Sequence, residues 1–353
     1  MILFHISHTD LDGYGCQLIT KEMLSLGQFK KGFFYNANYG QEVKLTIKKV
    51  LNQLDDFKEE EIFLLISDLN LTTQESKDLD KNINELNENG FNIKLQVLDH
   101  HATGQKSADM YHWYYLDINR CATKIVYDYM CEEYNAFDCD ERAWLSPLVD
   151  AINAVDIWLD HEIKNFEFGK VLLMMVSKAR EVNNILFADL NREYRIHLLK
   201  ESCKYLEEKD GNILLDNALH SMKKEFLKLD KKDDTLDNLS AKFLVKSLAD
   251  IKDELTITYK GHKGLLTYCL GSISIPANAF LKANRDFDFF IDVGRKGNSS
   301  FRADGKVDVA QMAAKLAKGG GHVNASGAKF MDFKETINYN DVKTYVQGKL
   351  DKI

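Results

Sequence analysis

Histidine and aspartate side chains follow three apolar runs in the N-terminal part of the chain, at residues 2–7, 62–67 and 93–98. The first run leads into His8, the second into Asp68 and the third into Asp99. Short apolar runs of this kind are typical of buried strands, and ligands of open parallel sheets collect just beyond the carboxyl ends of the strands. Carboxylate oxygens and imidazole nitrogens bind divalent cations. We therefore expect a metal site at one edge of a sheet.

The segment after the first run contains three of these side chains at close spacing. His8, Asp10 and Asp12 occupy alternate positions, and Gly13 follows them. Alternate residues of an extended chain point to one side, so an extended segment would place the three side chains on one face. Glycine at position 13 would then let the backbone turn into a helix. Acidic residues are also common in capped turns without a metal. This segment therefore supports a metal site only together with the polar residues at the other two strand ends.

Length, charge and cysteine content limit the kinds of protein that this chain can be. A length of 353 residues favours two domains. The net charge of −8 argues against binding to long duplex nucleic acid, which depends on neutralising phosphates. No apolar run approaches the roughly 20 residues that cross a bilayer, and the chain opens on a strand rather than a signal peptide, so we expect a cytoplasmic protein without a membrane partner. The six cysteines form no CxxC pair, so neither a disulfide framework nor a zinc ribbon is indicated.

The order of the apolar patterns predicts an α/β fold. Residues 1 to about 135 alternate strand-like and helix-like segments, which is typical of βαβ units and a mostly parallel sheet. Successive helices are expected after that, and strand-like runs return beyond about residue 254, beginning with a hairpin at 255–269. We therefore expect an α/β domain with the metal site at residues 1–165, a helical connector at 166–253 and a smaller α+β domain at 254–353.

A glycine-rich stretch near the C-terminus is a further candidate for chemistry. Gly319–Gly321 precede His322 and follow a helix expected at 309–318. Three glycines after a helix can form a simple C-cap and turn. Without side chains they could also let backbone N–H groups approach a phosphate closely, with His322 and Arg302 as additional donors.

Four short motifs together resemble those of the DHH phosphoesterases that carry a DHHA1 domain. The motifs are Ser7-His8-Thr9-Asp10-Leu11-Asp12-Gly13, Ser67-Asp68, Asp99-His100-His101 and Gly319-Gly320-Gly321-His322. The resemblance covers about 1–160 and 255–335, and the first motif is similar to that of the nanoRNase B-like branch, a relative of RecJ-type exonucleases. Many members of the family have a histidine four residues before the first aspartate of the pair, where this chain has Ile6.

The resemblance implies a hydrolase with two metal ions, usually Mn²⁺, with Mg²⁺ or Co²⁺ as alternatives. The implied metal ligands are His8, Asp10, Asp12, Asp68, His100 and Asp156, with Asp68 shared by both ions. Asp150 is the alternative to Asp156 as the last of these ligands. The implied catalytic residues are Asp68, Asp99 and His101. The implied substrate-binding residues are His101, Arg302, Gly319, Gly320, Gly321 and His322.

The function that the resemblance implies is hydrolysis of short oligonucleotides to mononucleotides, as in the nanoRNases, also called oligoribonucleases. Two alternatives belong to the same class, namely a phosphodiesterase for cyclic nucleotides or cyclic dinucleotides and a phosphatase for 3′-phosphoadenosine 5′-phosphate. A protein that senses nucleotides or metals without turnover is the alternative from another class. The expected partner is a short oligonucleotide or small nucleotide substrate, and the chain could form a homodimer.

Overall fold

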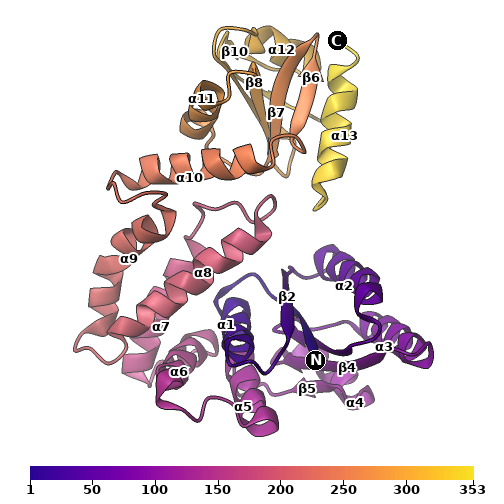
Figure 1. Cartoon of the computed structure of the whole chain (residues 1–353), viewed down its shortest axis with the longest axis vertical. Coiled ribbons are helices and arrows are strands. Elements are labelled where there is room, and N and C mark those ends of the chain that lie inside the picture. The colour runs from indigo at the N-terminus through magenta and orange to yellow at the C-terminus, as the bar shows by residue number, and fades with distance from the viewer. The chain divides into compact units, whose positions relative to one another are not determined.

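Five parallel strands form the first sheet of this protein, whose computed structural model describes residues 1–353. Their order is β2-β1-β3-β4-β5, and strands β2, β4 and β5 of this sheet are labelled in Figure 1. The strands are β1 (Ile2–Ser7), β2 (Lys31–Asn36), β3 (Glu61–Ser67), β4 (Asn92–Asp99) and β5 (Tyr114–Leu116). Because all five are parallel, their carboxyl ends meet at one edge. The predicted α/β fold with a mostly parallel sheet is confirmed.

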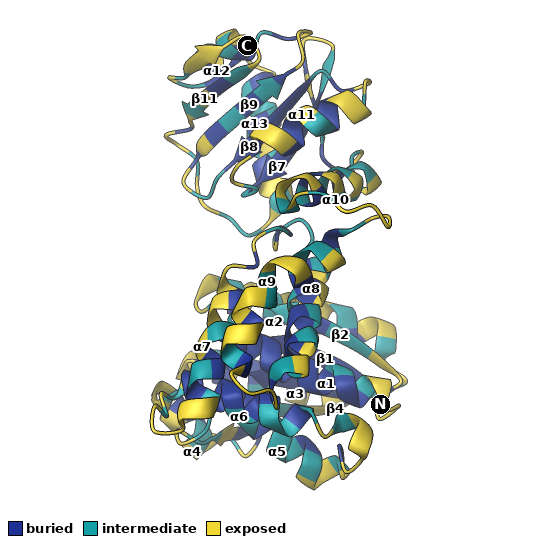
Figure 2. Cartoon of the chain, turned by 90° about the vertical axis from the view of Figure 1, so that its left-hand side faces the viewer, coloured by how far each residue is buried: buried dark blue, intermediate teal, exposed yellow.

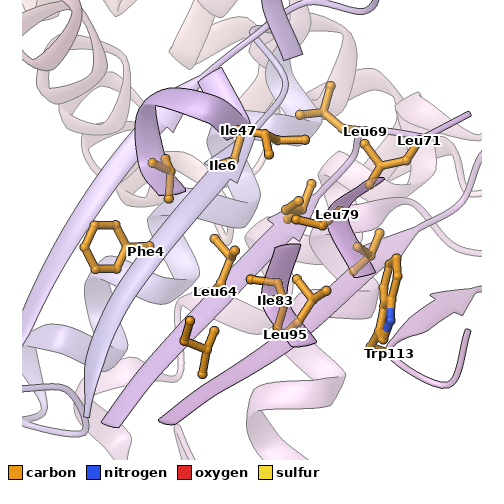
Figure 3. Packing of buried hydrophobic residues seen from close by; sticks show 14 of the residues in the cluster. Phe4, Ile6, Ile47, Leu64, Leu69, Leu71, Leu79, Ile83, Leu95 and Trp113 are labelled. Atoms are coloured by element: carbon orange, nitrogen blue, oxygen red, sulfur yellow. The ribbon is translucent and has the colours of Figure 1, made fainter. Parts of the chain in front are cut away.

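Helices cover both faces of this sheet, and alternate strand residues pack against them. On one face Phe4, Leu64 and Leu95 contact Ile47 of α2 and Ile83 of α3 (Figure 3). The opposite face packs on α1 and α5. Burial of each such side chain contributes about 1.5–3 kcal/mol, so the strands are held rigidly where their carboxyl ends present polar residues. The helices of this part are α1 (Leu11–Ser25), α2 (Gln41–Gln53), α3 (Thr73–Glu88), α4 (Gln105–Met110), α5 (Ala122–Tyr134) and α6 (Leu145–Asp156).

The chain divides into two units. The first comprises Met1–Arg180 and Arg192–Leu219, and the second comprises Glu181–Asn191 and His220–Ile353. The predicted connector, residues 166–253, contributes to both units, because α8 and α9 each begin in one unit and end in the other. The helices of this region are α7 (Ile163–Ser177), α8 (Ala188–Ser202), α9 (Gly211–Leu227) and α10 (Leu236–Asp250). Short 3₁₀ turns lie at Leu54–Phe57, Ala102–Gly104, Asp140–Arg142 and Cys203–Tyr205.

The second unit contains a mixed six-stranded sheet of order β10-β11-β9-β8-β7-β6. Strands β7 and β8 are parallel, and all other neighbours are antiparallel. The predicted hairpin is confirmed, since β6 and β7 pair in antiparallel fashion across a tight turn. The strands are β6 (Thr256–Tyr259), β7 (His262–Tyr268), β8 (Phe289–Val293), β9 (Asn298–Ala303), β10 (Gly320–His322) and β11 (Ala325–Lys329).

Helices also cover both faces of the second sheet. Leu266 and Ile291 belong to one core cluster with residues of α12 and α13, while Leu265 and Phe290 belong to another with residues of α10 and α11. Neighbouring positions of one strand therefore face opposite cores, as expected for a sheet covered on both sides. The remaining helices are α11 (Ser274–Ala283), α12 (Val309–Leu316) and α13 (Tyr339–Leu350).

The glycine stretch after α12 is a strand rather than a simple turn. Gly320–His322 pair with Ala325–Lys329 as the edge strand β10. Gly319 is required by packing, because a Cβ there would lie 2.5 Å from the carbonyl oxygen of Gly327. The interpretation of the stretch as a C-cap and turn is therefore wrong, because strand pairing satisfies backbone groups that a cap would leave to solvent.

Burial follows the layers of each unit. Figure 2 shows dark blue, buried strands such as β1 and β4, whereas helices such as α9 and α10 carry exposed residues along one side. None of the helices is both long and apolar enough to cross a membrane.

Candidate metal centre

The segment after β1 does not stay extended, in contrast to the expectation from its alternating pattern. Asp10 is the N-cap of α1, and its Oδ1 accepts a hydrogen bond of 3.0 Å from the N–H of Gly13. Asp12 already lies in the first turn of the helix. The expectation of an extended face is wrong because the cap satisfies an N–H group that the helix leaves free. Glycine is needed at position 13, where a Cβ would lie 2.4 Å from the carbonyl oxygen of His8.

The helix start nevertheless keeps His8 close to two carboxylates. Nδ1 of His8 lies 2.8 Å from Oδ2 of Asp10 and 3.7 Å from Oδ2 of Asp68. The side chain of Asn36, at the end of β2, donates a hydrogen bond of 2.8 Å to the carbonyl oxygen of His8. The ends of β1, β2 and β3 thus together determine where this imidazole lies.

Asp12 is held by the start of a distant helix. The backbone N–H groups of Ala122 and Thr123, at the first turn of α5, donate hydrogen bonds of 2.7 Å to its two carboxylate oxygens. The Thr123 hydroxyl donates another to the Asp12 carbonyl oxygen. A helix N-terminus offers free N–H groups to a carboxylate, which explains how this side chain can be only 1% exposed.

Asp68 is the first residue after β3 and adopts an unusual backbone conformation. Its φ is 56°, in the left-handed region that non-glycine residues rarely adopt. Its side chain is buried, and Oδ2 has no hydrogen-bond partner. The N–H of Asp68 donates a hydrogen bond to the carbonyl oxygen of Leu98 in β4, and this bond helps to hold the backbone of Asp68 in its left-handed conformation. Such strain is concentrated at functional sites.

His100 lies among three carboxylates from three different elements. Its Nε2 is 3.7 Å from Asp12, 3.5 Å from Asp68 and 3.6 Å from Asp156. Asp150 lies elsewhere, in an ion pair of 2.9 Å with Lys124. Six residues along a helix rotate a side chain by about 600°, so Asp150 and Asp156 must face different sides of α6. The geometry brings Asp156 to this cluster and leaves Asp150 outside it.

Asp99 anchors both histidines that follow it. Its Oδ1 accepts hydrogen bonds from the N–H groups of His100 and His101 and from Nδ1 of His101, the last at 2.7 Å. Its Oδ2 accepts one from the hydroxyl of Tyr114. The Asp99 carboxylate is therefore buried with hydrogen bonds to both of its oxygens, and these bonds fix the imidazole of His101 and the backbone of both histidines. Nε2 of His101 lies 2.9 Å from the hydroxyl of Tyr39.

Crowding of the carboxylates alters their pKa values. Burial, together with the negative charges of Asp12 and Asp10, raises the pKa of Asp156 to about 9. Burial and the charges of Asp12, Asp10 and Asp156 also raise the pKa of Asp68. For Asp10 burial acts in the same direction, but the hydrogen bond and charge of His8, together with the hydrogen bond from the Gly13 N–H, outweigh it and lower the pKa to about 2. The cluster thus concentrates negative charge where a cation would compensate it.

The donor atoms of the cluster fit divalent cations. Three groups have ligand atoms within 4.8 Å of one another, namely Asp68 with His100 and His101, His8 with Asp10 and Asp68, and Asp12 with Cys121 and Asp156. Asp68 belongs to two of these groups and offers a buried oxygen without a hydrogen-bond partner. Oxygen and imidazole donors suit Mg²⁺, Mn²⁺ and related ions. The residues therefore fit a metal centre, while the assignment of individual ligands stays a prediction.

Two of the predicted substrate-binding residues of the second unit, His322 and Arg302, share one row of the sheet. His322 pairs with Ala325, and Ala325 pairs with Arg302 on its other side, so the three side chains point to the same face. Arg302 donates a hydrogen bond of 2.9 Å to the hydroxyl of Ser274, the first residue of α11. Gly320 differs from its glycine neighbours, since a Cβ there would meet no atom within 4 Å. Their contact with substrate stays a prediction.

Sequence reasoning missed three residues of the metal centre. Tyr39 follows the end of β2, so the rule that strand ends carry function could have identified it. Tyr114 is at the start of β5, and a tyrosine in a strand is expected to pack in the core. Cys121 directly precedes α5, and nothing in its spacing in the sequence indicates that it lies beside Asp12 and Asp156.

A parallel sheet of order 2-1-3-4-5, with carboxylates and imidazoles beyond the ends of β1, β3 and β4, defines an α/β protein with a candidate dinuclear metal centre. No protein-family model matches the chain. A 3′,5′-cyclic-nucleotide phosphodiesterase from Helicobacter pylori (strain ATCC 700392 / 26695) is 43% identical over 347 residues, covering 98% of each chain. The chain therefore belongs to the family of this phosphodiesterase.

One solved structure agrees with the fold over its whole length. The crystal structure of an uncharacterized protein from Helicobacter pylori G27 matches with a TM-score of 0.93 and 42% identity over 100% of both chains. A crystal structure of exonuclease RecJ bound to manganese covers 100% of this chain and 90% of its own, at a TM-score of only 0.35 and 14% identity. The resemblance to DHH phosphoesterases is compatible with the family membership, and the nanoRNase B-like branch stays a prediction.

Proposed function

We propose that this protein is a metal-dependent phosphodiesterase that hydrolyses phosphodiester bonds of small nucleotides. One observation carries the proposal. Asp68 is a buried carboxylate with an oxygen that has no hydrogen-bond partner, it lies between His8 and His100, and the chain around it belongs to a phosphodiesterase family. A protein that only senses nucleotides has no need for so much buried negative charge.

The groups of donor atoms and the distances from His100 to Asp12 and Asp156 support the metal ligands that we propose. We assign one cation to His8 and Asp10, and a second to Asp12, His100 and Asp156. Asp68 would offer one oxygen to each cation. Our choice of ion is Mn²⁺, with Mg²⁺ or Co²⁺ as alternatives. The chemistry that such a pair supplies is deprotonation of a water near neutral pH and neutralisation of charge on phosphorus.

His101 is the residue we assign to the substrate phosphate or the leaving oxygen. Because Nδ1 donates its hydrogen to the Asp99 carboxylate, Nε2 is the atom available for binding and proton transfer. In the free protein Nε2 is hydrogen-bonded to Tyr39. Burial works against protonation, but the hydrogen bond to Asp99 and the negative charges of Asp99, Asp12 and Asp10 together outweigh it and raise the pKa of His101. A cationic His101 can hold a phosphate oxygen or donate a proton to the departing alkoxide.

The second unit is proposed to hold the nucleotide. Arg302 can make two parallel hydrogen bonds to a phosphate, and His322 in the same row of the sheet offers a further donor. The exposed backbone at Gly319–Gly321 would allow close approach of the ligand. Catalysis and nucleotide binding would then depend on different sets of residues.

The proposed substrate is first of all a 3′,5′-cyclic nucleotide, because the relative that is 43% identical is named for that activity. Short oligonucleotides are the second candidate, which the four sequence motifs favour. Cyclic dinucleotides and 3′-phosphoadenosine 5′-phosphate belong to the same chemical class. A homodimer also stays a prediction.

A substrate panel tests the proposal. The purified full chain is incubated with Mn²⁺ and with 3′,5′-cyclic AMP, 3′,5′-cyclic GMP, di- to pentanucleotides, a cyclic dinucleotide and 3′-phosphoadenosine 5′-phosphate, and the products are separated by chromatography. We expect metal-dependent hydrolysis of the cyclic nucleotides, of the short oligonucleotides, or of both. Binding of all compounds without any product would support the sensor instead.

Two aspartates of α6 provide a matched pair of variants for this assay. Asp156→Asn should lower activity strongly at limiting Mn²⁺, since it removes a ligand from the cluster around His100. Asp150→Asn should leave activity nearly unchanged, because that carboxylate forms an ion pair with Lys124. The opposite ranking would show that the fourth ligand has been assigned to the wrong residue.

A further inference from the structure

A thiol lies in the half of the centre that contains Asp156. Sγ of Cys121 and carboxylate oxygens of Asp12 and Asp156 lie within 4.8 Å of one another. Cys121 is fully buried and directly precedes the two residues whose N–H groups bind Asp12. The segment that fixes the Asp12 carboxylate therefore fixes the thiol beside it.

Two further observations indicate that a ligand belongs at this place. Nε2 of His100 faces the same two carboxylates, at 3.7 Å from Asp12 and 3.6 Å from Asp156. The same nitrogen is 3.5 Å from Oδ1 of Asp68, whose other carboxylate oxygen is buried without a hydrogen-bond partner. Carboxylate, imidazole and thiol groups thus converge, and all three are metal-binding side chains.

We propose that Cys121 supplies a thiolate ligand to the cation bound by Asp12, His100 and Asp156. The inference rests on the metal centre of the proposed function. Two donors of one ion are at most about 4.5 Å apart, given metal–sulfur and metal–oxygen bonds of about 2.3 and 2.2 Å, so small side-chain shifts would bring these atoms into range. On binding, the S–H bond breaks, the sulfur–metal bond forms and the proton passes to water.

The thiolate would make the two halves of the centre chemically different. The half with His8, Asp10 and Asp68 offers oxygen and nitrogen donors only, which suits Mn²⁺ or Mg²⁺. The half with Cys121 adds a soft donor, which favours Co²⁺, Zn²⁺ or Cd²⁺. We therefore expect the protein to bind two different cations when both kinds are present.

Cys16 is a matched control within the same chain. It is equally buried, and it lies on α1 near Thr123, with its Sγ 3.9 Å from the hydroxyl oxygen of that residue. For both thiols burial, followed by the charge of Asp12, raises the pKa. Only Cys121 belongs to a group of candidate ligand atoms. A difference between the two cysteines would therefore reflect ligation and not burial.

The test is the absorption spectrum of the cobalt form of the full chain. The protein is freed of metal with a chelator, titrated with Co²⁺ under reducing conditions, and analysed for metal content. We expect a sulfur-to-cobalt charge-transfer band in the near ultraviolet for wild type and Cys16→Ser, and its loss in Cys121→Ser. Cys121→Ser should also bind Cd²⁺ at least about tenfold more weakly, with a smaller effect on Mn²⁺.

The outcomes separate the two proposals. Wild-type protein that binds Co²⁺ without the band, or a Cys121→Ser variant that keeps it, would overturn the thiolate ligand and leave the proposed function intact. Wild-type protein that binds no divalent cation would overturn the metal centre itself. Absence of the band in wild-type protein overturns the thiolate ligand whether or not a variant folds, and Cys121→Ala is a second variant, of smaller volume, for assigning a band that is present.

Discussion

At the scale of single residues, Asp68 combines two features that each lower the free energy of unfolding. A left-handed backbone costs about 1–3 kcal/mol, and a buried carboxylate beside other carboxylates is unfavourable as well. The surrounding structure maintains both, through the bond from its N–H to Leu98 and through the imidazoles of His8 and His100. The proposed cations would compensate this loss of stability, because they would neutralise the carboxylate.

Asp68→Asn should therefore have opposite effects on activity and on stability. Hydrolysis should fall to below about a thousandth of the wild-type rate, comparable to the loss of a group that stabilises charge in the transition state. The Tm of the metal-free protein should rise, because a repelled negative charge has been removed. Turnover assays and thermal melts in chelator measure both effects. Wild-type turnover in the folded variant would contradict the two-metal scheme.

At the scale of elements, the two sheets present polar residues in different ways. In the first sheet these residues lie beyond the strand ends, where helix N-termini and turns fix them. In the second sheet Arg302 and His322 lie within strands, and the pairing of both with Ala325 sets their spacing. An inserted or deleted residue in β11 would therefore move them to opposite faces.

Asp292 in β8 should make stability depend on pH. Burial prevails over its hydrogen bonds from Thr267, Leu270 and Gly271 and raises its pKa from 3.8 to about 6. The folded form thus binds more protons than the unfolded form between about pH 4 and pH 6, so stability falls as pH rises through this window. The total loss is about 3 kcal/mol, at about 1.4 kcal/mol per pH unit. Urea unfolding of wild type and Asp292→Asn at several pH values should show a difference that grows across the window and is constant above it.

Substitutions of Gly320 and Gly321 should distinguish a role in binding from a role in folding within one strand. Gly320→Ala should change the free energy of unfolding by less than about 0.5 kcal/mol, since its Cβ meets nothing, but should raise KM for the nucleotide. Gly321→Ala should destabilise the protein by at least about 1 kcal/mol, because φ is +148° and its Cβ would lie 2.6 Å from the carbonyl oxygen of Ala325. Denaturant unfolding and steady-state kinetics test this pair. An unchanged KM in Gly320→Ala would argue against close approach of the substrate.

At the scale of the whole molecule, the two units differ in what they contribute to the proposed reaction. The metal-binding groups belong to the first unit, and the proposed nucleotide-binding groups belong to the second. Trp113, Trp144 and Trp158 are the three tryptophans of the chain, and all lie in the first unit. Tryptophan fluorescence therefore reports on the unit that holds the metal centre.

His322→Ala and Arg302→Ala should distinguish binding from catalysis. Both variants should weaken cleavage of a nucleotide substrate by the equivalent of about 1.5–3 kcal/mol, as expected for hydrogen bonds to a charged group. Both should hydrolyse bis(p-nitrophenyl) phosphate at nearly the wild-type rate, because that ester has no nucleoside to hold. Tryptophan fluorescence serves as the control for an intact first unit. Equal losses on both substrates would assign these residues to the catalytic centre.

The parallel sheet and most of the candidate metal ligands can be predicted from the sequence. Apolar runs identify strands because side-chain burial has a period, and polar residues at strand ends stand out against them. His8, Asp68, Asp99 and His100 can be chosen on this basis alone. The preference for Asp156 over Asp150 needs the family resemblance as well.

Which distant groups meet at this edge depends on the tertiary structure. The Asp12 carboxylate binds N–H groups more than a hundred positions away, Tyr39 reaches His101, and Cys121 lies beside Asp156. The periodicity of apolar residues in the sequence cannot predict such contacts, because they depend on how strands are ordered and on where helices begin. The same holds for the glycine stretch, which pairs with β11 as a strand in place of the expected turn. Local patterns predict elements, whereas the partners of a buried polar atom are set by the packing of the whole unit.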